Sequence, residues 1–404
     1  MKKLFAFAIG LWLVASTVFT ASAAFSSLYV FGDALSSTTD NPDASDYYNH
    51  RYSNGRVWVE VLAQRQGLIY DATKNISYWD HNSSNLVKEL KNFTAPADVA
   101  SDLFIVWVCN ADTFDATSTA INSQNTDANL LLNQFMGANN QAQAYHLQII
   151  TNLYAKGVRN LILPNVVDIS EIPAFNNGNL TSVLRGGCVD YNAKFANTIN
   201  QAIVLCPGLT IYAPDFYSLL NNVLTNAASY GLTNALSGGF SIDALDSLYV
   251  KPPTILNGPG TNYIFWDPQD PTAMFHEIIA DIAQQIISPV QISALKQING
   301  SNRLDVVNMP VGLNGFLDGS TNPVPGSWTL VTGFNSTNTT QSLFVATPPL
   351  VIGFGPPGSG GSGGPPTPGS GTDTNSVSNT NLIPYFISAS QFYRLRFPYA
   401  WNWP

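Results

Sequence analysis

The sequence predicts an α/β fold, a three-layer sandwich around a mainly parallel sheet, followed by a small antiparallel β-domain. Between about residues 25 and 292, short apolar runs alternate with longer helical patterns. The runs are apolar throughout their centres, as strands buried on both faces are. After about residue 295, apolar and polar residues alternate between Gly, Asn and Pro turns without a helical period, which is typical of antiparallel strands. We therefore expect domains at 24–292 and 293–404.

Four runs in the first domain are predicted strands, and two longer runs are predicted helices. The strands are "SLYVFGD" at 27–33, "DLFIVWVCN" at 102–110, "VRNLILPN" at 158–165 and "LTIYAPD" at 209–215, and the helices are at 128–157 and 273–288. Strand, helix and strand at this spacing imply parallel strands covered on both faces. Ligands of such sheets bind outside the carboxyl ends of the strands, so we expect the site there.

The first 23 residues predict a signal peptide. Lys2 and Lys3 precede the apolar run "LFAFAIGLWLVASTVF", and "ASA" at 21–23 offers small residues to a signal peptidase. The apolar run is short for a membrane span, and no later stretch reaches the roughly eighteen apolar residues that a span needs. We expect a secreted or periplasmic protein with no transmembrane segment in the mature chain.

Charge and cysteine content narrow the function classes. Acidic residues outnumber basic ones by 26 to 17, and such a surface repels phosphate backbones, so we expect no nucleic-acid partner. Three cysteines do not make a disulfide framework. Cys188 and Cys206 bracket a predicted helix that would hold them roughly 25 Å apart, too far to pair. Cys109 could pair with one of them, although three buried thiols are favoured.

The second domain shows strand patterning interrupted by one low-complexity stretch. Residues 355–371 read "GPPGSGGSGGPPTPGSG", a Gly/Pro/Ser-rich loop with too few apolar residues to order itself. "GLNGFLDGSTNPVPGSW" and the final "FYRLRFP" resemble small C-terminal β-modules of secreted bacterial proteins. This resemblance says little about activity.

Four runs of the first domain together resemble the SGNH, or GDSL, hydrolases, a family of esterases and lipases. They are "YVFGDALS" at 29–36, "RYSNGRVWVEVLAQRQGL" at 51–68, "FIVWVCNADTF" at 104–114 and "GPGTNYIFWDPQDPTAMFHEIIADI" at 258–282. Because they extend over roughly 25–290, the resemblance implies an SGNH/GDSL hydrolase-like, flavodoxin-like fold for the whole domain. It implies no cofactor.

The resemblance also assigns catalytic positions, and several of them are altered in this chain. Such an enzyme uses a serine nucleophile, a histidine base that an aspartate orients, and N–H donors for the oxyanion. The serine position is Ala34, the histidine position is Asp270, the aspartate is Asp267 and the glycine donor is Gly55. A gapless alignment puts Ala111 at the position of the asparagine donor, with Asn110 one place earlier.

Three such losses indicate a sequence that has drifted away from catalysis on a retained scaffold. Loss of the serine or the histidine alone can lower the rate of a serine hydrolase on the order of a millionfold. The main hypothesis is therefore a pseudo-hydrolase that binds a small-molecule ligand, acylated or carbohydrate, in the old pocket.

Two alternatives remain open. An active esterase or lipase could use displaced residues such as Ser36, His276 and Asn110, although serines at a helix start more often bond backbone N–H groups and a histidine on an apolar helix face is usually packed. His50 belongs to a loop expected to border the pocket. The second alternative is a surface or matrix protein that acts through the β-domain and the aromatic tail "FPYAWNWP".

Carboxylates gather at the predicted strand ends. Asp33, Asp267, Asp270 and Asp112 could together hold a hard cation or act as an acid and base on a sugar. Structural hydrogen bonds explain most of them equally well, so we predict no metal site.

Overall fold

A computed structural model describes residues 25–41, 46–246, 256–298, 300–346, 351–353, 385–387 and 391–398. The predicted signal peptide, the loop at 355–371 and the tail at 399–404 lie outside the described residues. The chain divides into two compact units, one running to Val290 with Asn308–Gly312 and Thr337–Thr340 added, and the other comprising the rest of the C-terminal region. The domain boundary between 292 and 293 stays a prediction.

The first unit is built on a parallel five-stranded sheet. Its strands are β1 (Leu28–Gly32), β2 (Asn75–Ser77), β3 (Leu103–Trp107), β4 (Asn160–Ile162) and β5 (Thr210–Tyr212), in the order β2-β1-β3-β4-β5. This is the flavodoxin-like order, in which the direction of winding reverses between β1 and β3. The α/β fold is confirmed, with β2 as a strand that the apolar pattern did not predict.

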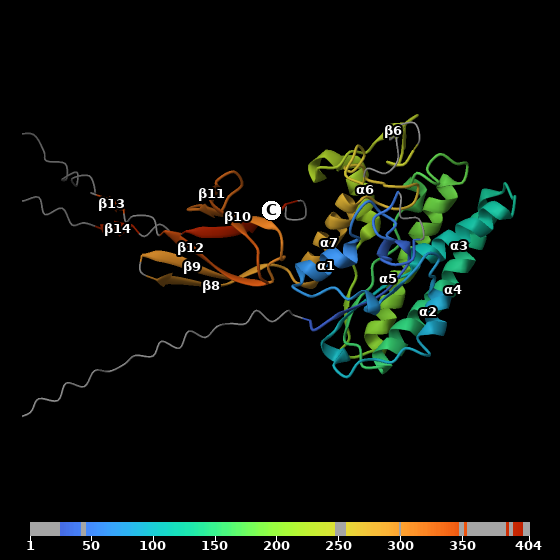
Figure 1. The fold of residues 1–404 in the computed structure, drawn as a ribbon, viewed down its shortest axis with the longest axis horizontal. Coiled ribbons are helices and arrows are strands. Elements are labelled where there is room, and N and C mark those ends of the chain that lie inside the picture. Colours follow the sequence, from blue (N-terminus) through green and yellow to red (C-terminus); the bar gives the residue numbers. More distant parts are fainter. Residues whose placement is uncertain are drawn as a thin grey trace, which may run out of the picture. The chain divides into compact units, whose positions relative to one another are not determined.

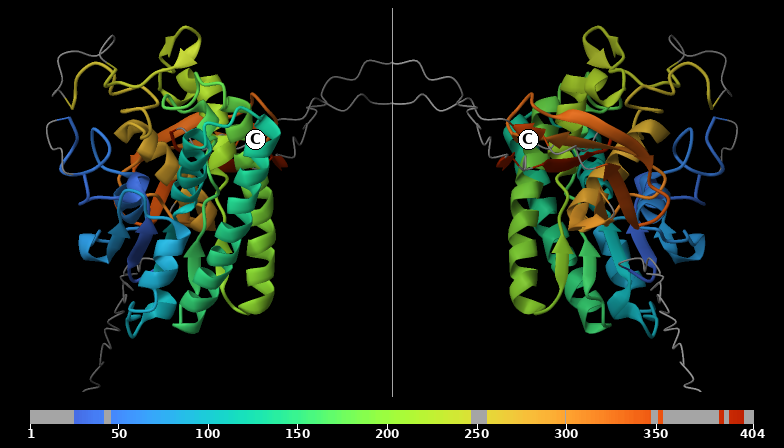
Figure 2. Two further views of the ribbon diagram at one scale, coloured as in Figure 1. Left: turned by 90° about the vertical axis from the view of Figure 1, so that its right-hand side faces the viewer. Right: turned by 90° about the vertical axis from the view of Figure 1, so that its left-hand side faces the viewer.

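Helices cover both faces of the sheet (Figures 1 and 2). On one face lie α1 (Trp58–Arg65), α6 (Phe216–Asn226) and α7 (Ala273–Ile287). On the other lie α2 (Ser83–Glu89), α3 (Cys109–Asn122), α4 (Ala128–Ala155) and α5 (Thr181–Leu205). The side chains of Asp127 and Thr272 cap α4 and α7 by accepting from backbone N–H groups of the first turn. These two helices correspond to the predicted 128–157 and 273–288.

Short elements complete the first unit. They are the 3₁₀ turns η1 (Ala34–Ser36), η2 (Ala72–Lys74), η3 (Val99–Ser101), η4 (Ile169–Glu171) and η5 (Ala227–Tyr230), and the two-residue strands β6 (Leu236–Ser237) and β7 (Phe240–Ser241). Cys109, Cys188 and Cys206 are buried free thiols, so the predicted absence of disulfides is confirmed. None of the helices in the described ranges is long and apolar enough to cross a membrane.

Aromatic side chains and one ion pair stabilise the face that carries α1, α6 and α7. The ring of Trp58 lies edge-on to that of Trp107, with centroids 5.4 Å apart, and Phe216 contacts both rings. The Arg65 guanidinium donates to Asp281 Oδ1 at 2.7 Å, and both residues are buried between α1 and α7. These contacts hold α1 against the sheet, against α6 and against the middle of α7.

The second unit consists of antiparallel sheets, as predicted. Its strands are β8 (Gln291–Ile298), β9 (Ser301–Val307), β10 (Asn314–Ser320), β11 (Thr329–Asn335), β12 (Thr340–Ala346), β13 (Val351–Gly353), β14 (Tyr385–Ile387) and β15 (Phe392–Arg396). The pairs β8–β9, β10–β11, β10–β15 and β13–β14 are antiparallel. Buried Asp318 accepts from Arg394 and Arg396, which ties β10 to β15.

Candidate functional site

The turn after β1 places two predicted site residues at the point where the winding of the sheet reverses. A Cβ on Gly32 would lie 2.6 Å from Ser36 Cβ, so the tight exit from β1 requires glycine. Asp33 then caps η1, because its Oδ1 accepts from Leu35 N at 3.1 Å. Ala34 follows at the edge of a cleft.

Asn110 joins the ends of β1, β3 and β4. It lies in the first turn of α3, directly after β3, where its Nδ2 donates to Asp33 Oδ2 at 3.1 Å. Its Oδ1 accepts from Val167 N, also at 3.1 Å, in the loop after β4. The side chain is 1% exposed. Asn110 therefore holds three strand ends together and uses its amide within the protein.

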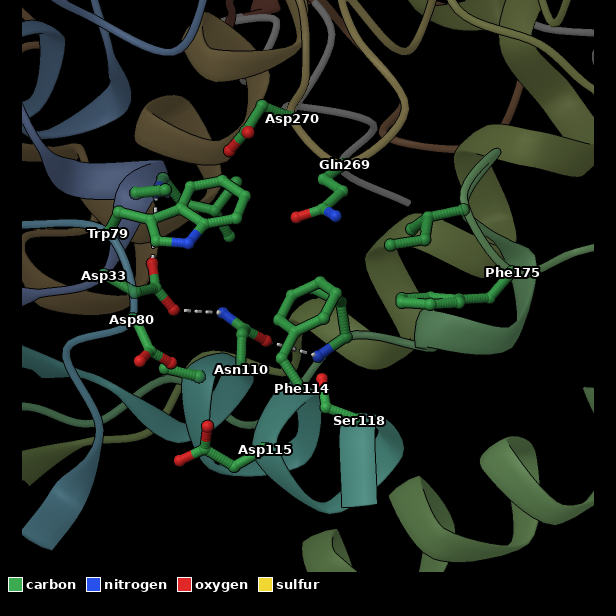
Figure 3. Close-up of a pocket in the computed structure, with 15 residues that line it drawn as sticks. Asp33, Trp79, Asp80, Asn110, Phe114, Asp115, Ser118, Phe175, Gln269 and Asp270 are labelled. Carbon is green, nitrogen blue, oxygen red and sulfur yellow. Dashed lines mark hydrogen bonds between the residues drawn. The ribbon is translucent and has the colours of Figure 1, made fainter. Parts of the chain in front are cut away.

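A cleft of about 150 Å³ opens above these strand ends (Figure 3). Five segments line it: the β1 turn, the loop before α2, the first turns of α3, the loop after β4 and the loop before α7. The lining residues are Asp33, Ala34, Leu35, Trp79, Asp80, Asn110, Ala111, Phe114, Asp115, Ser118, Val167, Ile172, Phe175, Gln269 and Asp270. Carboxylates and aromatic rings dominate this lining.

Asp270 is a buried acid without a counter-ion. Its side chain is 2% exposed, and its Oδ2 has no hydrogen-bond partner. Burial raises the pKa of Asp270 well above the usual value, and the negative charges of Asp267 and Asp33 raise it further. A positive charge brought close to this carboxyl would lower its pKa again.

The pKa of Asp33 is also raised. Burial raises the pKa of Asp33 to about 7, although the hydrogen bonds from Asn110 and Leu35 oppose the shift. Burial likewise raises the pKa of Asp115 to about 6, with a contribution from the neighbouring Asp80 and against the hydrogen bond from Asn82. The cleft therefore contains carboxyl groups that change charge between about pH 5 and 8.

Comparison with known proteins decides the family. The family model for GDSL-like lipase/acylhydrolase matches residues 28–283, which is more than half of the chain. The chain belongs to this GDSL family.

Similar proteins include plant GDSL esterases/lipases and a bacterial lipase of known structure. One GDSL esterase/lipase of Arabidopsis thaliana is 22% identical over 273 residues, which are 57% of this chain and 73% of the relative. A second from the same plant is 26% identical over 165 residues, 37% of this chain and 42% of the relative. The crystal structure of an extracellular lipase from Streptomyces rimosus covers 61% of this chain and 93% of its own, with 14% identity and a TM-score of 0.35.

Five of the residues that the sequence assigned to the GDSL site line the cleft: Asp33, Ala34, Asn110, Ala111 and Asp270. Ala111 follows Asn110 in α3, so the gapless position and its neighbour both reach the cleft. Asp267 lines an adjoining recess with Tyr47 and Tyr52, and this recess shares Trp79, Gln269 and Asp270 with the cleft.

Asp267, which the sequence resemblance assigns to the aspartate position of the triad, shapes the loop before α7. Its Oδ1 accepts from the backbone N–H groups of Gln269 and Asp270 at 2.8 and 2.7 Å. Its Oδ2 accepts from the hydroxyl of Tyr47 at 2.9 Å. Both carboxylate oxygens are thus engaged without a histidine, and the contacts hold Asp270 in place at the cleft.

Gly55 lies outside the cleft lining and packs against the start of α7. A Cβ on Gly55 would lie 2.6 Å from Ala273 Cβ, so a larger residue does not fit without movement. The neighbouring Asn54 fixes this approach, because its Oδ1 accepts from Ala273 N at 2.8 Å. The close packing accounts for glycine here without a catalytic role.

Neither histidine that the sequence nominated reaches the cleft. His276 is fully buried, its Nδ1 accepts from Trp58 N at 3.3 Å, and burial lowers its pKa to about 3. His50 is exposed, and its Nδ1 donates to the carbonyl of Asn41 at 2.7 Å. His276 is therefore a packed histidine of an apolar helix face, as expected for such a position, and His50 makes a hydrogen bond within its own loop region.

Ser36 is directed into the core. Its hydroxyl accepts from Trp58 Nε1 at 3.0 Å, and the residue is fully buried. The expected partner was a backbone N–H; Ser37 has one, because its Oγ accepts from Asp40 N at 3.3 Å. Among the described residues, no serine hydroxyl is hydrogen-bonded to a histidine ring.

Asp112 belongs to a buried network behind the cleft. Its Oδ1 accepts from the backbone N–H and the hydroxyl of Ser83, at 2.9 and 2.8 Å. Its Oδ2 contacts His146 Nε2 at 3.1 Å and accepts from Tyr191 at 2.7 Å. This network joins α2, α3, α4 and α5. Over the described ranges, no group of three or more His, Cys, Asp or Glu side chains is arranged to hold a metal ion.

The sequence interpretation missed part of the cleft. Trp79 and Asp80 follow β2, a strand of three residues that lacks a long apolar run. Phe114, Asp115 and Ser118 lie three, four and seven positions after Ala111, which is the spacing of one helix face. If a helix had been predicted over 109–122, Phe114, Asp115 and Ser118 would have been expected at the same edge of the sheet.

We expect Asp270→Asn to raise the free energy of unfolding by about 2 kcal/mol at pH 8, the order that an unsatisfied buried group costs. The folded pKa of Asp270 exceeds the unfolded value of 3.8, so this carboxyl destabilises the fold increasingly as pH rises above about 4. Asparagine keeps the shape of the carboxyl and carries no charge at either pH. Urea unfolding at pH 4.5 and 8 measures the difference, and an equal gain at both pH values would contradict the explanation.

Proposed function

We propose that the chain is an exported GDSL-family protein that binds a small acylated or carbohydrate ligand in the cleft and does not hydrolyse esters. One observation carries the proposal: the cleft presents Ala34 and Asp270 where the family resemblance places the nucleophile and the base. Ser118 also lines the cleft, but no histidine is among the described lining residues to accept its proton. The sequence of the first 23 residues supports export.

The oxyanion donors give further support. Stabilisation of a tetrahedral intermediate requires N–H groups aimed at the position of the developing negative charge. Asn110 Nδ2 instead donates to Asp33 Oδ2, and Gly55 packs against Ala273. Among the described lining residues, the position assigned to the nucleophile carries no hydroxyl, one Nδ2 hydrogen of Asn110 is committed to Asp33, and Gly55 is absent from the lining. This arrangement supports a cleft that is not prepared for ester hydrolysis.

The surroundings of the cleft suit a ligand with a polar head and an apolar body. An apolar recess adjoins the cleft and shares Leu35, Val167, Ile172 and Gln269 with it. Its remaining lining is Trp107, Phe216, Leu219, Leu220, Phe265, Pro271, Phe275 and Ile279. On another side, the rings of Tyr52 and Trp79 lie 5.3 Å apart and could stack on a sugar.

Hydrolysis of short and medium p-nitrophenyl esters by the mature chain tests the proposal. We expect rates at the background level for the parent and for the Asp267→Ala, Ser118→Ala and His276→Gln variants, with circular dichroism checking that each variant folds. A parent rate above background that any one of these substitutions abolishes would overturn the proposal and identify the displaced machinery. An Ala34→Ser/Asp270→His variant reports whether the scaffold still accepts a nucleophile and base.

A further inference from the structure

We propose that the cleft selects an organic cation, a ligand with an ammonium head group on a small apolar body. This inference rests on the proposed function, in which the cleft binds a ligand, and it specifies the charge of that ligand. It arises from the chemistry of the lining, which combines carboxyl groups that face no basic side chain with aromatic rings.

The first observation is that the acidic groups of the cleft face no basic side chain. Four carboxyl groups line the cleft, namely Asp33, Asp80, Asp115 and Asp270, and they come from four different segments. The described part of the lining contains no Lys, Arg or His. Two of the four, Asp33 and Asp270, are buried, and buried carboxylates are normally paired, because removing a charge from water without a partner is costly. A positively charged ligand would supply the missing partner.

The second observation is the free oxygen of Asp270. This oxygen, Oδ2, is buried and has no hydrogen-bond partner within the described structure. In the view of Figure 3, the Asp270 carboxyl lies above Trp79, and the Asp33 carboxyl lies below it, beside Asn110. An ammonium group between these carboxyls would satisfy Oδ2 with a charge-assisted contact, the stronger class of hydrogen bond.

The third observation concerns the shape of the cation. Over the described ranges the acids do not form a metal-binding group, so the cleft does not provide the compact oxygen shell that a hard metal ion needs. Instead, Trp79, Phe114 and Phe175 share the lining, and the last two rings lie 5.6 Å apart. Aromatic faces attract organic cations, and the rings also contact the apolar body of such a ligand.

The charge state of the cleft makes the affinity pH-dependent. Asp33 and Asp115, with pKa values of about 7 and 6, must lose protons to attract a cation. The titratable groups around them are Asp80, Asp112, Asp267, Asp270, Tyr47, Tyr52 and His81. For a ligand whose own charge is fixed, affinity should therefore rise between pH 5 and pH 8, and binding should release protons.

Isothermal titration calorimetry with matched probes tests the inference. Phenethylammonium and 2-phenylethanol have similar shapes and differ in charge, and benzyltrimethylammonium keeps its charge at every pH. We expect phenethylammonium to bind the mature chain at least tenfold more tightly than the alcohol at pH 8. The affinity for benzyltrimethylammonium should fall at least fivefold at pH 5. Equal affinities for the matched pair, or no detectable binding of either cation, would overturn the inference.

Three substitutions distinguish attraction of the cation by the carboxyl groups of the cleft from attraction by the net charge of the whole protein. Asp80→Asn should weaken cation binding severalfold without unfolding, because asparagine tolerates the left-handed backbone of this residue, φ 62°. Asp270→Asn should weaken it at least tenfold. Glu277→Gln removes an exposed charge of α7 outside the cleft lining and should leave the affinity unchanged. An equal loss in all three variants would point to non-specific attraction by the net charge of −9 and would contradict the inference.

The ester assay distinguishes a failure of the proposed non-hydrolytic function from a failure of the inference about the charge of the ligand. Ester cleavage together with cation selectivity would refute the non-hydrolytic function and retain the inference about charge. Background hydrolysis with no preference for the cation would refute the inference and leave the non-hydrolytic function standing.

Discussion

Replacing Trp58 by alanine is expected to lower the free energy of unfolding by about 4 kcal/mol, as truncation of a large aromatic core residue does. Trp58 is fully buried, and its ring packs against Trp107 and Phe216 at centroid distances of 5.4 and 5.9 Å. The substitution would leave a cavity between α1 and the sheet and would remove the donor to Ser36 Oγ. Urea denaturation followed by far-ultraviolet circular dichroism measures the loss.

Trp58→Phe is the matched control for this prediction. Phenylalanine fills most of the space but lacks the indole N–H, so we expect a smaller loss of about 2 kcal/mol, in part from the unpaired Ser36 hydroxyl. A loss below about 1.5 kcal/mol for the alanine variant would mean that the core collapses around the site.

Replacing Asp281 by alanine is expected to destabilise the protein by a similar amount, about 4 kcal/mol, because it leaves the buried Arg65 guanidinium without its carboxylate. The pair joins α1 to α7 at 2.7 Å, with side-chain exposures of 4% and 2%. Burial raises the pKa of Asp281 to about 6 in spite of the nearby Arg65. Desolvation therefore outweighs the attraction between the two charges at this carboxyl.

The double variant Arg65→Met/Asp281→Leu tests that interpretation. Because both charges are removed and the volume is largely kept, we expect a stability within about 1 kcal/mol of the parent, or above it. A double variant as unstable as Asp281→Ala would show that the ion pair itself stabilises the contact between α1 and α7. Thermal unfolding at pH 7 compares the parent, Asp281→Ala and the double variant.

Much of the fold was predictable because its strands and helices have strong local patterns. The apolar runs at 102–110 and 158–165 contain β3 and β4, and the long periodic segment at 128–157 contains α4. β2 was missed because a strand of three residues has no period to detect. The predicted strand at 102–110 included the first two residues of α3, since the apolar run extends beyond Trp107 into the first turn of that helix.

The candidate site was predictable only where strand ends and the family resemblance agreed. Asp33 and Asn110 follow β1 and β3, and both line the cleft. Trp79 follows β2 and Asp115 lies in α3. Because neither element was predicted, the sequence did not indicate that these two residues reach the cleft. Gly55 was nominated from the resemblance, yet its close approach to Ala273 could be seen only in three dimensions.

The contact between Asn110 and Asp33 bears on how this protein could evolve. One Nδ2 hydrogen of Asn110 is committed to Asp33, and Val167 N holds the Oδ1 of the same amide. The amide cannot turn without breaking one of these contacts, which leaves only its second Nδ2 hydrogen for a new partner. A chain that acquired a serine at 34 and a histidine at 270 would therefore meet an amide of fixed orientation, and any activity it gained would depend on where that second hydrogen points.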